Sequence, residues 1–416
     1  MKTTLTTLLL ALLTLMASAQ EKIILLNEGN WQSDNARLTY FEDGRIVSNK
    51  WFRDVNGRKI GDTPTDIIQI HDNLIAIAVN WSNIVQFITP EGKAVAATED
   101  VPNNRKLATD GRYVYVTSYA HECGAMTFTK GYVAKIDTET FKVVAATEVG
   151  YEPEGIACYD GHLFVANSGG YAFQEGHDYE RTVSIIDAAT MKVVRTIDTG
   201  VINLYGKMSQ SGKFLMISSP GDYYENPARS IVFDCRKALD GEKNCFTVLP
   251  FPATYSTATR EGTFLCIGSS YSYLTGGYEF SHHTIDPSEV MASGGASGVG
   301  EEFPGTVARD IEAFAQPYAL YMNPYTGYIY ATDAGGYVSG GKMMQWDSNG
   351  KRLGEHSVYI NPGHFLALPP DGKFTGITEV AAPRSDGAFY DLSGRRVTNP
   401  LSGGIYIKDG RKIIKK

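Results

Sequence analysis

Short apolar and alternating runs recur along most of the chain, and each is bounded by a tight-turn signal. The clearest runs cover residues 74–79, 113–116, 162–166, 213–217, 263–267 and 328–331. β-Branched and aromatic residues in such runs are typical of strands. Few segments show apolar residues at the spacing of about 3.6 residues that is typical of an amphipathic helix. The pattern therefore predicts an all-β protein.

The predicted strands belong to a repeating unit of about fifty residues. A two-residue turn marks each copy: Asp72-Asn73, Asp110-Gly111, Asp160-Gly161, Ser211-Gly212, Glu261-Gly262 and Thr326-Gly327. Such pairs favour tight hairpins because Gly and Asn tolerate positive φ. In two copies a third strand ends at Asp137 or Asp187, and a short turn leads to an outer strand. Four-stranded units at this spacing are typical of β-propeller blades.

The last copy of the repeat is divided between the two ends of the chain. Residues 361–368 have the pattern of an innermost strand with an Asp371-Gly372 turn, but its three partners do not follow. Segments 23–26, 38–41 and 46–52 supply three strands at the N-terminus. Pairing the two ends would close the ring and remove exposed strand edges. We expect a seven-bladed propeller; six or eight blades remain alternatives because residues 281–310 are irregular.

Both ends of the chain carry segments that we separate from the propeller. Lys2, the apolar run 8–16 and the small-residue site at 17–19 predict a cleaved signal peptide over residues 1–19. This run is too short to span a membrane, and no later stretch approaches the necessary length. We therefore expect an exported monomer in the periplasm, at the cell surface or secreted. The propeller is predicted over 20–372, a linker over 373–388 and a small β segment over 389–416.

The net charge restricts the classes of binding partner, and the cysteines indicate a candidate disulfide. The formal net charge is −8, and basic residues cluster only at the last few positions, which disfavours nucleic acid and anionic membranes. Among the five cysteines, Cys235 and Cys245 flank a turn-like segment and are candidates for a disulfide. No Cys/His spacing indicates a structural zinc.

The predicted topology places a ligand site on one face of the ring. Loops between the second and third strands of each blade share that face with the connections between blades, and they are long, Gly-rich and aromatic. Such loops on a rigid ring often form binding surfaces. The alternative is that their aromatic side chains only pack the loops together. The candidate ligand-binding residues are Trp31, Trp81, Tyr119, His121, Tyr151, Glu152, Tyr171, Phe173, Tyr205, Tyr223, Tyr271, Tyr273, Tyr318, Tyr337 and His364.

Several segments resemble known propeller families. The strand at 113–117 resembles YVTN-type propellers. Residues 26–31, 317–334 and 360–365 look like the surface-exposed propellers of Bacteroidetes that include cobalamin-capturing partners of outer-membrane transporters. The resemblance covers roughly residues 22–370. It implies a seven-bladed ring and, for some members, corrinoid binding on the loop face with an outer-membrane transporter as partner.

One feature departs from the cobalamin-capturing members. Those proteins resemble lipoproteins, whereas no cysteine follows the apolar run of this chain. Residues 390–397 and 404–407 instead resemble the C-terminal sorting modules of the same phylum. The resemblance therefore leaves the attachment to a transporter as an open alternative.

YVTN-type rings are also similar to lactonase propellers, so a hydrolase is the second hypothesis. Lactone hydrolysis needs a general base with a charge stabiliser, or a metal, converging on one point. Asp62, Glu152, Glu154 and His364 are expected near the channel mouth but form no known motif. Nucleophile-elbow and His-Glu-x-x-His motifs are absent from the sequence. We therefore predict a binding protein without catalytic residues, resident cofactor or metal; a protein-docking scaffold is the third hypothesis.

Overall fold

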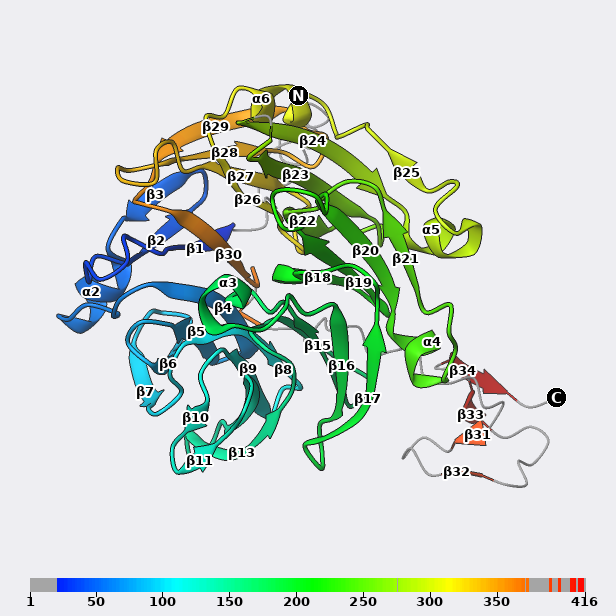
Figure 1. Cartoon of the computed structure of the whole chain (residues 1–416). Coiled ribbons are helices and arrows are strands. Elements are labelled where there is room, and N and C mark those ends of the chain that lie inside the picture. The colour runs from blue at the N-terminus through cyan, green and yellow to red at the C-terminus, as the bar shows by residue number, and fades with distance from the viewer. Residues whose placement is uncertain are drawn as a thin grey trace.

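The chain forms a ring of seven four-stranded antiparallel blades, which confirms the predicted all-β propeller (Figure 1). This computed structural model describes residues 21–274, 276–370 and 372–373, together with short strands between 389 and 414. The predicted signal peptide and nearly all of the predicted linker lie outside the described residues.

Each blade begins with its innermost strand, which lies next to the ring axis (Figure 1). Blade 1 contains β4 (Pro64–His71), β5 (Leu74–Val79), β6 (Ile84–Ile88) and β7 (Ala94–Thr98); blade 2 contains β8 (Asn104–Thr109), β9 (Tyr113–Ser118), β12 (Tyr132–Asp137) and β13 (Lys142–Glu148); blade 3 contains β14 (Pro153–Tyr159), β15 (His162–Asn167), β16 (Thr182–Asp187) and β17 (Lys192–Asp198). Blade 4 contains β18 (Tyr205–Ser211), β19 (Phe214–Ser219), β20 (Arg229–Asp234) and β21 (Phe246–Leu249); blade 5 contains β22 (Tyr255–Ala258), β23 (Phe264–Ser272), β24 (Gly277–Ile285) and β25 (Val299–Gly300); blade 6 contains β26 (Pro317–Met322), β27 (Ile329–Asp333), β28 (Lys342–Trp346) and β29 (Arg352–Ser357).

Blade 7 joins the two ends of the ring, as the sequence predicts. It contains β30 (Pro362–Leu368), β1 (Lys22–Asn27), β2 (Arg37–Glu42) and β3 (Arg45–Ser48). In the antiparallel pair of β1 and β30, Ile24 lies opposite Leu366 and Leu25 opposite Phe365. The ring therefore closes by main-chain hydrogen bonds between segments far apart in sequence.

Two segments differ from the expected strand pattern. The outer strand expected over residues 46–52 ends at Ser48, and Trp51 begins the helix α2 (Trp51–Asn56). The Trp51 ring stacks on Tyr40 with centroids 4.8 Å apart, and a Cβ on Gly92 would lie 2.8 Å from it. Burying this large ring outweighs continuation of the strand.

The irregular segment 281–310 belongs to blade 5. After β24 it contains the helix α5 (Pro287–Ser293), the two-residue strand β25 and the start of α6 (Val307–Glu312). Asp286 caps α5 by accepting hydrogen bonds from the backbone N–H groups of Ser288 and Glu289. The blade keeps four strands, and the blade count is seven.

The remaining described elements lie outside the blades. β10 (Glu122–Cys123) and β11 (Met126–Thr127) form a hairpin, and α3 (Ala172–Glu175) and α4 (Cys235–Leu239) are short helices. The predicted C-terminal segment contains β31 (Phe389–Tyr390), β32 (Arg396–Val397), β33 (Ile405–Lys408) and β34 (Arg411–Ile414) in one sheet. Among the described residues, the helices all lack the length and apolar character needed to cross a membrane.

The hydrophobic core lies between neighbouring blades. Phe164 of blade 3 and Phe233 of blade 4, for example, are fully buried with ring centroids 5.9 Å apart. Burial of one such side chain stabilises a fold by about 1.5–3 kcal/mol. Because every blade is packed on both sides, the ring is a rigid support for the strands around the axis.

The same core contains the two cysteines that were candidates for a disulfide. Cys235 and Cys245 are free thiols in the structure, so the proposed bond is not formed. Both side chains are completely buried between blades 3 and 4. Burial raises the pKa of each thiol, which suppresses the thiolate that disulfide formation requires.

Candidate ligand-binding site in the central channel

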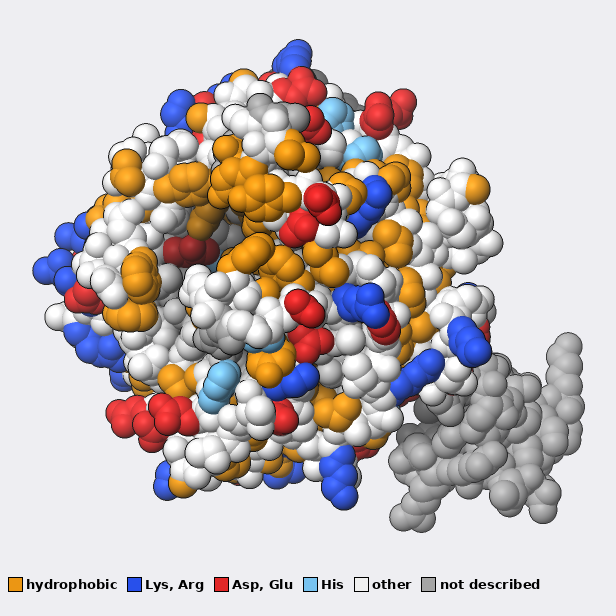
Figure 2. Space-filling view, viewed as in Figure 1, with side chains coloured by type: hydrophobic (Ala, Val, Ile, Leu, Met, Phe, Trp, Pro, Cys, Tyr) orange, Lys and Arg blue, Asp and Glu red, His pale blue; other side chains and the backbone are white. Residues whose placement is uncertain are grey.

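The innermost strands surround a cavity of about 970 Å³ on the ring axis. All seven blades contribute residues to its wall. The lining extends from Glu28 and Thr63 at the loop face to Asp110 and Gly111 at the opposite face. Figure 2 shows a hollow on the loop face, bordered by hydrophobic side chains and with acidic atoms at its edge.

β-Bulges direct polar side chains into this channel. The pairing register shifts near the start of six innermost strands, namely β4, β8, β14, β18, β26 and β30. In β8, Asn104 pairs with Ser118 of β9 and Leu107 pairs with Val116. The two residues between them, Arg105 and Lys106, therefore lie opposite one residue of β9. Bulges redirect side chains out of the regular alternation. Glu154 of β14 and Lys207 of β18 occupy equivalent irregular positions.

Arg105 and Glu154 form the first of three charged clusters. Arg105 Nε donates to Glu154 Oε1 over 2.7 Å, and Nη2 lies 2.5 Å from the same oxygen. The hydroxyl of Tyr119 also donates to this oxygen, and the guanidinium lies 4.6 Å above the Tyr119 ring. Burial opposes ionisation of Glu154, but Arg105 and Lys106 outweigh it and hold its pKa below the usual value. The negative charge of Glu154 raises the pKa of Tyr205 to about 12.

The second cluster contains Glu28, His364 and Tyr318. Glu28 follows β1; its Oε1 lies 3.0 Å from His364 Nε2, and its Oε2 accepts a 2.7 Å hydrogen bond from Tyr318. Gly363 makes room for this contact, because a Cβ there would lie 2.5 Å from Glu28 Oε1. Burial lowers the pKa of His364 and the charge of Lys106 adds to the effect, although Glu28 opposes it. The other ring nitrogen, Nδ1, lies 4.0 Å from Asp66 Oδ1, so that His364 stands between two carboxylates.

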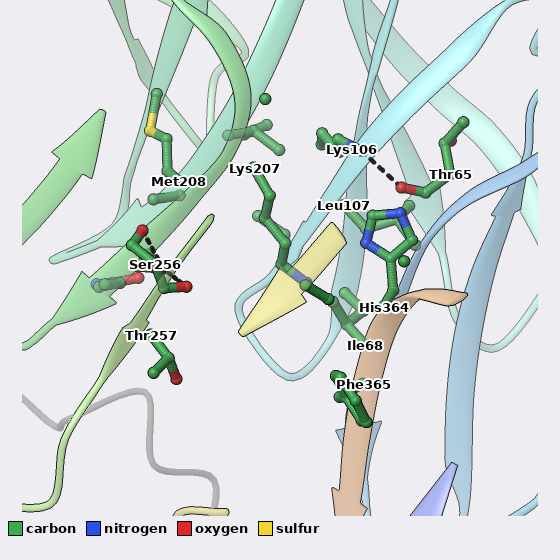
Figure 3. A pocket seen from close by; sticks show the side chains of 18 of the residues that line it. Thr65, Ile68, Lys106, Leu107, Lys207, Met208, Ser256, Thr257, His364 and Phe365 are labelled. Atoms are coloured by element: carbon green, nitrogen blue, oxygen red, sulfur yellow. Dashed lines mark hydrogen bonds between the residues drawn. The ribbon is translucent and has the colours of Figure 1, made fainter. Parts of the chain in front are cut away.

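The third cluster crosses the channel. Lys207 Nζ lies 2.6 Å from Asp66 Oδ1, which joins blade 4 to blade 1 on the other side of the ring. The Asp66 side chain is fully buried and also accepts backbone hydrogen bonds from Ile67 and Leu107. Lys106 Nζ donates to the carbonyl of Thr65 over 2.7 Å (Figure 3). Burial lowers the pKa of Lys106.

Below these clusters the channel wall is more apolar. Ile68, Leu107, Ile156, Met208 and Phe365 line it, with hydroxyl groups between them. The Ser209 hydroxyl, for example, donates to the Ser256 carbonyl over 2.6 Å. The cavity thus offers charged groups at its loop-face end and a largely apolar surface beneath them, the combination typical of small-molecule sites.

Three of the residues proposed from sequence line the channel, and a fourth packs behind its wall. Tyr205, Tyr318 and His364 line the cavity, and the buried Tyr119 donates a hydrogen bond to Glu154, the partner of the lining residue Arg105. Tyr337 lies beside Tyr318 with ring centroids 5.9 Å apart. Tyr119, Tyr205, Tyr318 and His364 come from blades 2, 4, 6 and 7, and the ring brings them to one axis.

The other proposed residues lie on the surrounding loops. Trp31 and Trp81 are exposed and in edge contact, with centroids 5.1 Å apart. Tyr273 contacts Tyr223 and Tyr271 at 6.4 Å and 5.0 Å. Tyr151 stacks on His177, and Tyr171 contacts the Tyr119 ring and donates its backbone N–H to Glu152. Phe173 and His121 are exposed. Part of the aromatic set therefore packs the loops together, as the alternative interpretation expected.

The four residues considered for hydrolysis do not converge. Glu154 and His364 belong to the channel clusters described above. Asp62 accepts hydrogen bonds from the Asp34 backbone and the Thr63 hydroxyl, and it does not line the cavity. Glu152 lies 3.3 Å from His177 Nε2. In the part of the chain that the structure describes, no group of three or more His, Cys, Asp or Glu side chains is arranged to hold a metal ion.

Sequence reasoning missed five charged residues of the channel. These are Glu28, Asp66, Arg105, Lys106 and Lys207. The available signal was the position of four of them just before the turn pairs, where the innermost strand of each blade must lie; Glu28 follows β1 and carries no such signal. A charge in an otherwise apolar innermost strand must be paired or face the channel.

Comparisons with known proteins show the fold. No protein-family model matches the chain, and no curated protein matches it. The chain is similar to hydrazine synthase from Kuenenia stuttgartiensis (15% identity, 75% of this chain and 91% of that chain, TM-score 0.53). It is also similar to a functionally unknown protein from Desulfotomaculum acetoxidans (11%, 83% and 98%, 0.52). A quinonprotein alcohol dehydrogenase-like protein from Bacteroides thetaiotaomicron shares the fold (10%, 84% and 78%, 0.52). At these identities the similarity establishes the β-propeller fold alone.

Proposed function

We propose that the protein binds a small organic ligand at the loop-face end of its central channel. The observation that carries this proposal is the set of bulges that bring Arg105, Lys106 and Lys207 to the wall of a cavity of about 970 Å³. Cavities of this size, with an apolar wall and a few convergent polar groups, are typical of small-molecule sites. Holding charged groups out of water is costly, and a binding role accounts for their presence.

A corrinoid is the first candidate ligand. It is supported by the resemblance of residues 26–31 and 360–365 to cobalamin-capturing propellers and by the exposed aromatic rings of Trp31 and Trp81 beside the channel face. Flat aromatic surfaces suit a broad, partly apolar ligand. Export is part of the same proposal and is supported by the signal-like residues 1–19. An outer-membrane transporter is then the candidate partner.

The test is calorimetric titration of the chain lacking residues 1–19 with cyanocobalamin, cobinamide and a panel of glycans. We expect saturable binding of one class and a loss of about tenfold or more in Arg105→Met, because a charge-assisted hydrogen bond is removed. Arg236→Met is the control, since Arg236 pairs with Asp240 outside the channel. Absence of binding across the panel, or equal binding by both variants, contradicts the proposal. The first of these outcomes would favour protein docking.

Hydrolysis is the second candidate function, and the geometry of His364 favours it. Glu28 orients the ring through its contact with Nε2; in the tautomer with the proton on Nε2, Nδ1 of this cavity-lining residue would be the proton acceptor. Such a base would take a proton from attacking water, while Arg105 or Lys106 would stabilise the developing oxyanion.

A panel of lactones tests this second candidate. We expect turnover to fall by about 10²-fold or more in His364→Gln, which keeps a hydrogen-bonding group but loses the base. His71→Gln, on an exposed hairpin, is the control. Turnover that survives in His364→Gln, or no turnover by the unaltered protein, would exclude this role.

A further inference from the structure

Two lysines in the channel carry hydrogen-bond donors that the protein itself does not use. An ammonium group has three N–H donors. Among the described residues, Lys106 Nζ makes one hydrogen bond, to the Thr65 carbonyl, and Lys207 Nζ makes one, to Asp66. Two donors on each ammonium group are therefore left for a ligand.

The two ammonium groups approach the same place from different blades. Lys106 extends from β8 in blade 2 and Lys207 from β18 in blade 4, yet their partners Thr65 and Asp66 are neighbours on β4. Both lysines line the cavity. Figure 3 shows Lys106 directed at Thr65, and Asp66 Oδ1, which Lys207 contacts, lies 4.0 Å from His364 Nδ1. The unused donors thus converge on one part of the channel.

The carboxylates around them are already supplied with donors. Asp66 accepts from Lys207, from Ile67 N and from Leu107 N. Both oxygens of Glu28 are likewise engaged. Glu154 Oε2 has no hydrogen-bond partner among the described residues, but it is buried and has no surface to offer. Near the two lysines, the carboxylates thus already have donors, whereas the ammonium groups keep donors for a ligand.

We propose that the ligand carries an oxyanion, a carboxylate or a phosphate group, and that this group binds between Lys106 and Lys207. The inference rests on the proposed binding function and specifies the chemical class of the ligand. An oxyanion has several acceptor lone pairs and a charge opposite to both ammonium groups, so each hydrogen bond is charge-assisted. Lys106 is almost fully buried and provides a fixed donor, whereas the side chain of Lys207 is 43% exposed and has room to adjust.

The experiment uses inorganic phosphate and citrate as probes, one for each kind of oxyanion, in calorimetric titrations at low ionic strength. We expect saturable binding of at least one probe and a loss of about tenfold or more in Lys207→Met. Lys213→Met is a matched control. Lys213 pairs with the buried Asp234 at 2.8 Å and is 42% exposed, but it does not line the cavity. This control should bind the probe as the unaltered protein does.

A second variant separates the role of the ammonium group from damage by an unpaired carboxylate. Lys207→Met leaves Asp66 buried without its ion pair, which alone can distort the site. The double variant Lys207→Met with Asp66→Asn removes both charges and should bind the probe as weakly as the single variant. Recovery of binding in the double variant would overturn the inference.

The remaining outcomes distinguish this inference from the proposed function. If neither probe binds but an uncharged member of the ligand panel does, the oxyanion inference fails and the binding function stands. If nothing binds, both fail. Equal probe binding by Lys207→Met and the unaltered protein also overturns the inference, whatever the panel shows.

Discussion

Single residues show how buried charge is tolerated in this fold. Asp66 has no exposed surface, and burial opposes its ionisation, yet Lys207 and His364 lower its pKa below the ordinary value. Removing a buried ion from water costs several kcal/mol unless a close partner compensates. The channel therefore depends on paired charges, and changing one member disturbs its partner.

A histidine outside the channel has no hydrogen-bonded partner among the described residues, and it provides a test in which burial is the largest effect. The ring of His283 stacks on Phe251 with centroids 3.7 Å apart, and neither ring nitrogen has a hydrogen-bond partner in the described structure. Burial lowers the pKa of His283 from 6.5, and the charge of His282 adds to this while Glu301 opposes it. In the unfolded chain the same ring keeps its ordinary pKa.

We expect His283 to make the protein less stable in mild acid. As the pH falls through about 6.5, the unfolded state takes up the proton first, so the free energy of unfolding decreases. Urea unfolding between about pH 7.5 and 5.5 should show a smaller loss in His283→Gln than in the unaltered protein. His71→Gln, at an exposed position, should keep the full loss. Parallel pH profiles for all three proteins would contradict the assignment.

At the scale of elements, the bulges determine which side chains reach the axis. The bulge in β18 is the largest among the innermost strands. Tyr205 pairs with Ser218 of β19 and Ser209 pairs with Met216, so that the three residues 206–208 lie opposite Ile217 alone. Gly206, with φ of +90°, lies within this bulge next to Lys207. L-Residues with side chains rarely adopt this conformation, so the glycine allows the bulge that aims Lys207 across the channel.

Gly206→Ala tests the dependence of the site on this bulge. We expect the free energy of unfolding to fall by about 1 kcal/mol or more, measured by urea denaturation, because the backbone becomes strained. Phosphate binding should weaken as Lys207 moves. Gly336→Ala is the control, because Gly336 has no positive φ and no atom within 4 Å of an added Cβ. Equal stability of the two variants would show that the bulge tolerates a side chain.

At the scale of the whole molecule, the central channel exists because the ring is closed. β30 supplies its innermost strand to blade 7 through pairing with β1, and the same strand carries His364. Without β30, the edge of β1 would be exposed and one side of the cavity would be missing.

Truncation tests this closure directly. A chain that ends at Ile360 lacks β30, and we expect loss of the cooperative thermal transition together with aggregation in size-exclusion chromatography. A chain that ends at Lys373 keeps all seven blades and should retain the transition. A cooperative, monomeric protein that ends at Ile360 would show that the ring does not need its closing strand.

Much of the fold was predictable because its signals are local. Turn pairs such as Asp110-Gly111 and the apolar runs beside them depend on conformational preferences of neighbouring residues. The closure followed from counting strands at both ends, and the pairing of Ile24 with Leu366 confirms it. The helix that begins at Trp51 was missed because a tertiary contact with Tyr40 overrode the strand pattern.

The candidate site was predicted only in part. Tyr205, Tyr318 and His364 were identified because they lie where a connection between blades leads into an innermost strand, which topology places at the channel mouth. Arg105 and Lys106 were missed because consecutive strand residues normally point to opposite faces. Only the pairing of β8 with β9 reveals the bulge that turns both toward the axis.

The sequence by itself therefore determined the repeat, the all-β architecture, the number of blades once the ends were paired, and the face that carries the aromatic loops. The tertiary structure decided which charges meet. Lys207 and Asp66 are 141 positions apart, and His364 and Glu28 are 336 apart. The physical reason is that turns and strands follow from short-range preferences, whereas these contacts depend on strand register and on closure of the whole ring.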